Sequence, residues 1–95
     1  MPAYLIAEQI IKDEIKFEQY KNAVMPLIAR FGGKYLTKGT PKILAGKVWK
    51  PERIIIVEFP DMAALDAWYA SPEYQPLMKL RDEGATVMAI ALEAA

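Results

Sequence analysis

The chain alternates between hydrophobic runs that fit strands and amphipathic stretches that fit helices. The central run, Arg53–Pro60, contains four consecutive β-branched residues, Ile54–Val57. Such residues favour strands, and Pro60 ends the strand because proline has no N–H to donate to a neighbour. Both parities of this segment are apolar, which is typical of a strand covered on both faces.

Three further strands are predicted around it. Pro2–Ile11 is apolar at both parities in its first half, and Ala85–Leu92 is a similar run near the end of the chain. Lys34–Thr37 is a shorter candidate, and Lys42–Ala45 could either continue this strand or pair with it after a turn. Gly46–Glu52 then forms a loop that leads into the central strand. Frequent lysines along this part of the chain are typical of a sheet edge protected against aggregation.

The first helix is predicted at Glu14–Arg30, where apolar residues recur at intervals of three and four. Asp13 is the expected N-cap. Pro26 removes one backbone hydrogen bond and should kink the helix or end its regular part. Gly32 and Gly33 then stop the helix, because glycine takes a positive φ at little steric cost.

A second helical region follows the central strand. Asp61 is expected to cap a helix at Met62–Ala70. A further helical piece should start at Ser71 as N-cap, with Pro72 at the first helical position. Asp82–Gly84 is expected to end it.

The resulting order is strand, helix, strand, strand, helix, strand. This order divides into two halves, each a strand, a helix and a strand. Two βαβ halves with right-handed crossovers form a four-stranded antiparallel sheet with the helices on one face, which is the ferredoxin-like βαββαβ plan. We therefore predict an α+β fold with one domain over residues 1–95. The other sheet face is also apolar, and a second copy is the simplest cover for it. Two sheets packed face to face would make a dimeric α+β barrel, so a homodimer is expected.

Alternation along the strands assigns side chains to the two faces. Small residues suit close packing of helices on a sheet, so the alanines of the first and last strands are assigned to the helix side. The opposite set should then face the barrel interior: Tyr4, Ile6, Ile54, Ile56 and Glu58.

Composition narrows the possible functions. Of the 95 residues, 54% are hydrophobic, which is high for a short chain with little interior, so part of this surface should meet a partner. Twelve basic and twelve acidic residues leave no net charge. This balance argues against attraction to nucleic acid or anionic membranes, and we expect neither as a partner.

The chain has no cysteine and no histidine. Disulfides, thiolate nucleophiles, the usual zinc sites and histidine-dependent catalysis are therefore excluded. Gly32-Gly33 lacks the spacing and the lysine-serine pair of a phosphate loop, and we expect no cofactor and no metal. We expect no secretory signal, because the N-terminus lacks a basic segment followed by an apolar run. No apolar run approaches the roughly 20 residues of a membrane helix. A cytoplasmic location is the resulting expectation.

Several segments resemble one uncharacterised family, catalogued as domain of unknown function 1330. They are Pro51–Pro60, Ala67–Gln75, Gly32–Leu36 and Pro2–Tyr4. The resemblance extends over essentially the whole chain and implies the dimeric α+β barrel fold. It implies no established activity.

Two positions depart from the family's pattern. Members commonly carry a glycine where this chain has Thr40, and they often carry an acid where it has Ala45. If that acid takes part in catalysis in relatives, its absence would remove the activity here.

Glu58 is the candidate general base, because an acid on an otherwise buried strand must be paired, protonated or facing a polar cavity. The alternative is an ion pair with Arg53, Lys50 or Arg81. Arg53 itself could bind a ligand carboxylate through its planar fork, or pair with an acid within the protein.

Aromatic residues supply the other candidate ligand contacts. Trp68, Tyr69 and Tyr74 could line a pocket with two hydroxyl groups, and Tyr4 is similar. At helical spacing, Trp68 could equally be core or a dimer contact. Ser71, beside a proline and without a histidine, is interpreted as a cap and not a nucleophile.

Three functions remain open at this point. The first is a homodimer that binds a small, mostly apolar molecule with one polar end. The second is a cofactor-independent enzyme, isomerase-, decarboxylase- or monooxygenase-like, using Glu58 with a tyrosine or Arg53. The third is a structural or interaction protein with no site. The identity of a ligand is not determined, because fold does not fix function.

Overall fold

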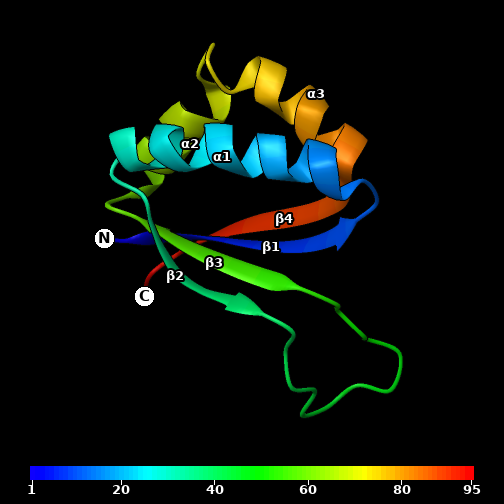
Figure 1. Cartoon of the computed structure of the whole chain (residues 1–95). Helices are drawn as coiled ribbons and strands as arrows, with labels where there is room; N and C mark the ends of the chain where they lie inside the picture. Colours follow the sequence, from blue (N-terminus) through cyan, green and yellow to red (C-terminus); the bar gives the residue numbers. More distant parts are fainter.

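Helices and strands form two layers in the computed structural model, which describes residues 1–95. All neighbouring strands are antiparallel, in the order β2-β3-β1-β4, and the helices cover one face of the sheet (Figure 1). This arrangement confirms the predicted ferredoxin-like fold, with the second helix split into two. The elements are β1 (Ala3–Ile11), α1 (Glu14–Arg30), β2 (Lys34–Gly39), β3 (Ile54–Phe59), α2 (Met62–Ala70), α3 (Gln75–Gly84) and β4 (Ala85–Glu93).

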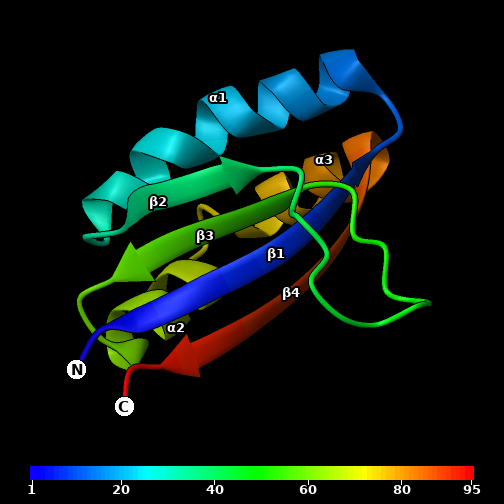
Figure 2. The same ribbon diagram turned by 90° about the horizontal axis from the view of Figure 1, so that it is seen from below.

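The strand register separates two sets of side chains. Ala3 lies opposite Phe59, and Leu5 lies opposite Val57; these residues point towards the helices, where Ala3, Val57 and Phe59 are completely buried. Tyr4, opposite Glu58, points to the other face. That face carries no helix, as Figure 2 shows from below. We call it the open face.

Helix α1 has the predicted bounds and the predicted N-cap, since Asp13 Oδ1 accepts a hydrogen bond from the Lys16 N–H at 3.1 Å. The helix does not end at Pro26 but continues to Arg30. Pro26 and Asn22, whose carbonyl loses its partner, are both exposed, so water can replace the missing hydrogen bond. No helix has both the length and the apolar character needed to span a bilayer.

Helix α3 begins later than the sequence predicts. Residues 72–74 form a turn, and the helix runs from Gln75. Ser71 ends α2: its hydroxyl donates to the Trp68 carbonyl at 2.8 Å and accepts from the Tyr74 N–H at 3.3 Å. The serine hydroxyl therefore stabilises the bend between α2 and the turn before α3. It does not begin α3 directly, although the sequence predicted that it would.

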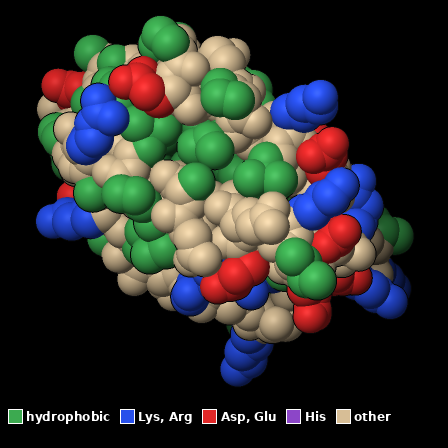
Figure 3. Space-filling model, turned by 45° about the horizontal axis from the view of Figure 1, so that its top comes forward, with side chains coloured by type: hydrophobic (Ala, Val, Ile, Leu, Met, Phe, Trp, Pro, Cys, Tyr) green, Lys and Arg blue, Asp and Glu red, His purple; other side chains and the backbone are tan.

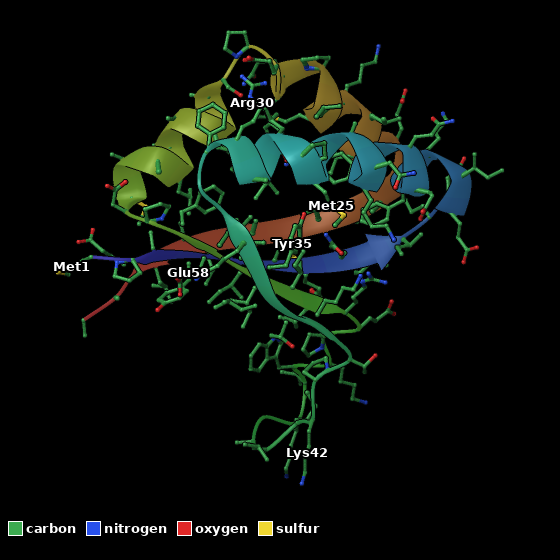
Figure 4. All side chains as sticks on the ribbon, turned by 60° about the vertical axis from the view of Figure 1, so that its left-hand side comes forward. Met1, Met25, Arg30, Tyr35, Lys42 and Glu58 are labelled. Atoms are coloured by element: carbon green, nitrogen blue, oxygen red, sulfur yellow. The ribbon has the colours of Figure 1, made fainter.

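The connection between β2 and β3 is longer and less regular than expected. Lys42–Ala45 neither continues β2 nor pairs with it, and residues 40–53 form no strand. The segment projects away from the two layers, with Lys42 near its tip (Figure 4). Val48 is 94% exposed and Trp49 is 65% exposed. Nothing in the subunit covers these apolar side chains. Because no neighbouring strand pairs with the segment, it is not held in an extended conformation.

Candidate functional site

A cavity of about 230 Å³ lies between the sheet and the helices. Its walls come from all four strands on one side and from α1, α2 and α3 on the other. Sixteen of its 22 lining residues are hydrophobic. The lining includes Met25 of α1 and Leu36 of β2, both exposed, so the cavity opens to solvent between these elements. Figure 4 shows Met25 and Tyr35 close to each other on this side.

Buried aromatic rings form one end of the cavity. The ring centroids of Trp68 and Tyr74 are 4.4 Å apart, and those of Tyr69 and Tyr74 are 5.4 Å apart. Trp68 and Tyr74 are almost completely buried, whereas Tyr69 is 40% exposed. The rings therefore serve as core and as cavity wall together, and the tyrosine oxygens and the indole N–H of Trp68 add polarity.

These tyrosine hydroxyls belong to a polar cluster with Arg81. The hydroxyls of Tyr20 and Tyr74 are 2.9 Å apart and share a hydrogen bond. Arg81 Nη1 donates to the Tyr74 hydroxyl at 3.3 Å and to the Tyr69 hydroxyl at 3.5 Å. The other side of the same guanidinium holds the Asp82 carboxylate, with Nε 3.0 Å from Oδ1. The cluster is a rigid, hydrogen-bonding end to an otherwise apolar cavity.

Burial controls the protonation of this cluster. It raises the pKa of the Tyr20 hydroxyl well above the usual value, with a further increase from Tyr74. Burial also raises the pKa of Tyr74, and it raises the pKa of Tyr35 to about 12. Burial acts to lower the pKa of Arg81, but hydrogen bonds to Asp82 and Tyr69 outweigh it and raise that pKa. Tyr20, Tyr35 and Tyr74 therefore keep their protons at neutral pH, and Arg81 is a cation.

A β-bulge brings another cation to the cavity. The pairing of β2 with β3 shifts at Leu36: Tyr35 lies opposite Val57, but Thr37 lies opposite Ile56. Lys38 consequently lies opposite Ile55 and shares its helix-side face. Without the extra residue, Lys38 would fall on the open face, because a shift by one residue reverses every side chain.

The predicted site residues fall into two groups on opposite faces of the sheet. Arg53, Trp68, Tyr69 and Tyr74 all line the cavity. Tyr4 and Glu58 are cross-strand neighbours on the open face.

Glu58 therefore does not share a cavity with the other candidates. Figure 4 shows it on the side of the sheet away from the helices. Its carboxylate lies 3.7 Å from Lys34 Nζ, so its nearest cation is not one of the three that the sequence suggested. A catalytic role for Glu58 stays a prediction.

Sequence reasoning did not single out Tyr20 or Tyr35 as site residues, and it named Arg81 only as a possible partner of Glu58. Periodicity placed Tyr20 on the apolar stripe of α1, which correctly indicates burial but hides the role of its hydroxyl. No three acidic side chains come together in a way that could hold a metal ion.

Comparison with known proteins identifies relatives and the fold. A family described as a domain of unknown function, DUF1330, matches residues 2–95. The search of curated proteins gave no match. Among solved structures, the RPA0582 protein of unknown function from Rhodopseudomonas palustris is 20% identical, with a TM-score of 0.76 over 99% of this chain and 82% of that chain.

Two other solved structures are similar in fold. A dimeric ferredoxin-like protein of unknown function from Jannaschia sp. CCS1 is 15% identical, with a TM-score of 0.71 over 99% of this chain and 100% of that chain. SnoaB, a cofactor-independent oxygenase from Streptomyces nogalater, is also 15% identical, with a TM-score of 0.71 over 99% of this chain and 93% of that chain. At these identities the similarity shows a shared fold, not a shared reaction. From the match over residues 2–95, the chain belongs to the DUF1330 family, as its sequence motifs indicated.

Proposed function

We propose that the protein is a homodimer, associated through the open face of its sheet, and that each subunit binds a small, mostly apolar molecule in its cavity. The observation that carries the second part is the cavity itself: an apolar chamber closed at one end by hydrogen-bonding tyrosines and a guanidinium. Small-molecule sites usually have this construction, with apolar walls and a few fixed polar groups.

The open face supports the homodimer. Its apolar side chains stand unshielded in the single subunit, including Ile90 at 59% and Leu92 at 53% exposure. Large exposed apolar patches on soluble proteins mark interaction surfaces. The similar ferredoxin-like protein from Jannaschia is described as dimeric. A second copy supplies a surface of the same shape and apolar character, which suits a two-fold interface.

Filling the cavity tests the binding function. Ala89 lines the cavity, and Ala23 lies exposed on α1 outside it. We expect Ala89→Leu to abolish the thermal stabilisation that small aromatic compounds give the wild-type protein. The matched variant Ala23→Leu should keep it. Equal stabilisation of both variants, or none of the wild type by any compound in an aromatic panel, would contradict the proposal.

The polar cluster also favours a second candidate, a cofactor-independent enzyme. A tyrosine hydroxyl beside a guanidinium can donate a hydrogen bond to an oxyanion that develops during a reaction. SnoaB, which shares the fold, is described as an oxygenase of this kind. In a panel of carbonyl and phenolic compounds, Tyr74→Phe would then lose turnover while ligand binding persists. If Glu58 is the catalytic base, its substrate must lie between the sheets of the two subunits, and Glu58→Gln would lose turnover instead.

A further inference from the structure

We propose that the molecule bound in the cavity is a small organic anion: an aromatic or branched aliphatic carboxylate whose charge is held by Arg53. This inference rests on the proposed binding function and specifies the chemistry of its ligand. It follows from the charges of the lining residues, from two unpartnered buried donors, and from the volume of the cavity.

The charged residues of the lining are all basic. They are Lys21, Lys38, Arg53 and Arg81, and no Asp or Glu is among the 22 lining residues. The whole chain, by contrast, has equal numbers of acidic and basic residues. Figure 3 shows both charges interspersed on the outer surface of the helical side. The positive character is therefore a property of the cavity, and a low-dielectric chamber strengthens its attraction for an anion.

Two of these cations already have partners in the protein. Lys21 Nζ lies 3.2 Å from the Glu18 carboxylate, and Arg81 is held by Asp82. Arg53 is different: its side chain takes part in no hydrogen bond or ion pair within the subunit. Its Nε atom is buried and without an acceptor. A buried guanidinium N–H without a partner is unfavourable, and a ligand carboxylate is the acceptor whose geometry it fits best.

A second unpartnered donor lies in the same lining. The indole Nε1 of Trp68 is buried and makes no hydrogen bond. The Tyr69 and Tyr74 hydroxyls line the cavity nearby, and each can donate its own proton while it accepts a hydrogen bond from Arg81. Every polar group that is free to meet a ligand is thus a donor or can act as one, so the complementary ligand presents acceptor oxygens.

The position of Lys38 adds to this charge. The β-bulge at Leu36 places Lys38 on the helix-side face, where it joins the cavity lining next to Ile55 on the adjacent strand. Bulges commonly redirect a side chain at functional sites. Here the redirection adds a flexible cation at the exposed end of the cavity, where an entering anion would first meet it.

The volume sets the size of the apolar part of the ligand. The cavity of about 230 Å³ exceeds the roughly 150 Å³ that holds a benzene molecule. It falls short of the roughly 300–1,000 Å³ of pockets for drug-sized molecules. A single aromatic ring, or a branched chain of similar bulk, with a short carboxylate arm fits between these limits.

A pair of probes of equal size tests the charge directly. Phenylacetate and phenylacetamide differ in charge but hardly in shape, and calorimetric titration gives the affinity of each. We expect phenylacetate to bind about 10- to 100-fold more tightly, as is typical of charge-assisted hydrogen bonds. Arg53→Gln should remove this preference, because it removes the cation that holds the carboxylate. The substitution breaks no hydrogen bond or ion pair within the subunit, so the fold should persist.

Arg30→Gln is the matched control, because it removes an arginine that lies outside the cavity and pairs with Glu73 at 3.3 Å. It should keep the full preference for phenylacetate. Equal affinities of the wild type for both probes would overturn the anion inference and leave the binding function standing. A preference that survives in Arg53→Gln would overturn the role of Arg53. If neither probe binds, and neutral aromatic compounds also fail, the proposed function itself is overturned.

Discussion

The two faces of the sheet are built from the same four strands, but they differ in burial and in charge. On the helix side, Val57 and Phe59 are completely buried, and the charged residues of the cavity lining are all basic. On the open face, Ile90 and Leu92 are more than half exposed, and Glu58 pairs with Lys34. Apolar residues on both faces thus have two different uses. One face forms the core and a chamber, and the other is a surface that suits a second subunit.

This difference separates the two kinds of stability that a substitution can affect. A change on the helix side acts on the fold of one subunit, whatever the protein concentration. A change on the open face acts on association, so its effect depends on concentration. The predictions below use this distinction.

The largest effect is expected for Ile90→Glu. In a face-to-face dimer, each subunit brings one new carboxylate into the interface. The loss of water around these two carboxylates should weaken association by roughly 100-fold or more. Sedimentation at micromolar concentration should then give a single 10.7 kDa chain instead of twice that mass. Ile15→Glu is the control, because Ile15 is 74% exposed on α1. A dimer that persists in Ile90→Glu would show that the open face is not the interface.

On the helix side, Phe59→Ala should lower the free energy of unfolding by about 3–5 kcal/mol, because it leaves a void under the helices. Its ring packs 5.5 Å, centroid to centroid, from Trp68. Urea denaturation at several protein concentrations measures the effect. The loss in Phe59→Ala should be the same at every concentration, whereas the loss in Leu92→Ala should be small where the subunits are monomeric and should grow with concentration as the wild type dimerises. The same concentration dependence for both variants would contradict the assignment of the two faces.

Alkaline pH should destabilise the helix side through its buried tyrosines. The raised pKa of Tyr20 means that its hydroxyl keeps its proton in the folded state at a pH where the unfolded chain loses it. This stabilising contribution is therefore complete below the usual tyrosine pKa of 10.0 and is lost as the pH rises above it. Unfolding followed by circular dichroism should show a steeper fall above this pH in the wild type than in Tyr20→Phe. Identical slopes would mean that Tyr20 ionises freely in the folded state.

The smallest effect is expected for Glu58→Gln. The pair with Lys34 is partly exposed, with Lys34 at 70% and Glu58 at 27% side-chain exposure, so its loss should cost about 0.2–1 kcal/mol. Ligand affinity in the cavity should be unchanged, because Glu58 lies on the other face. A titration of phenylacetate against the variant tests this, and a large loss of affinity would mean that the two faces are coupled.

Local patterns predicted most elements well. The bounds of α1 and α2 and the aspartate caps of both follow from residues within a few positions of each other. The β-branched run Ile54–Val57 correctly indicated an inner strand. Errors occur where the local pattern competes with contacts elsewhere. The hydroxyl of Ser71 could cap either helix, and its bonds to the Trp68 carbonyl and the Tyr74 N–H bend the chain before α3 begins.

The site was only partly predictable. Arg53, Trp68, Tyr69 and Tyr74 were selected by residue type, and all four line one cavity. Tyr4 and Glu58 lie on the other face of the sheet. This position follows from the strand register, which depends on pairing between β1 and β3. The Tyr20–Tyr74 hydrogen bond joins residues 54 positions apart and left no local signal, because Tyr20 looks like an ordinary apolar position on α1 and Tyr74 lies in the turn before α3.

By itself, the sequence determined where most helices and strands begin and that the sheet would be apolar on both faces, because caps, periodicity and β-branching act over a few neighbouring residues. Only the tertiary structure decided which face holds a cavity and which groups meet there. The bulge that turns Lys38 to the helix side exists only against β3, and the four cations of the lining come from four separate segments. Such groupings depend on packing between distant parts of the chain, which no local pattern encodes.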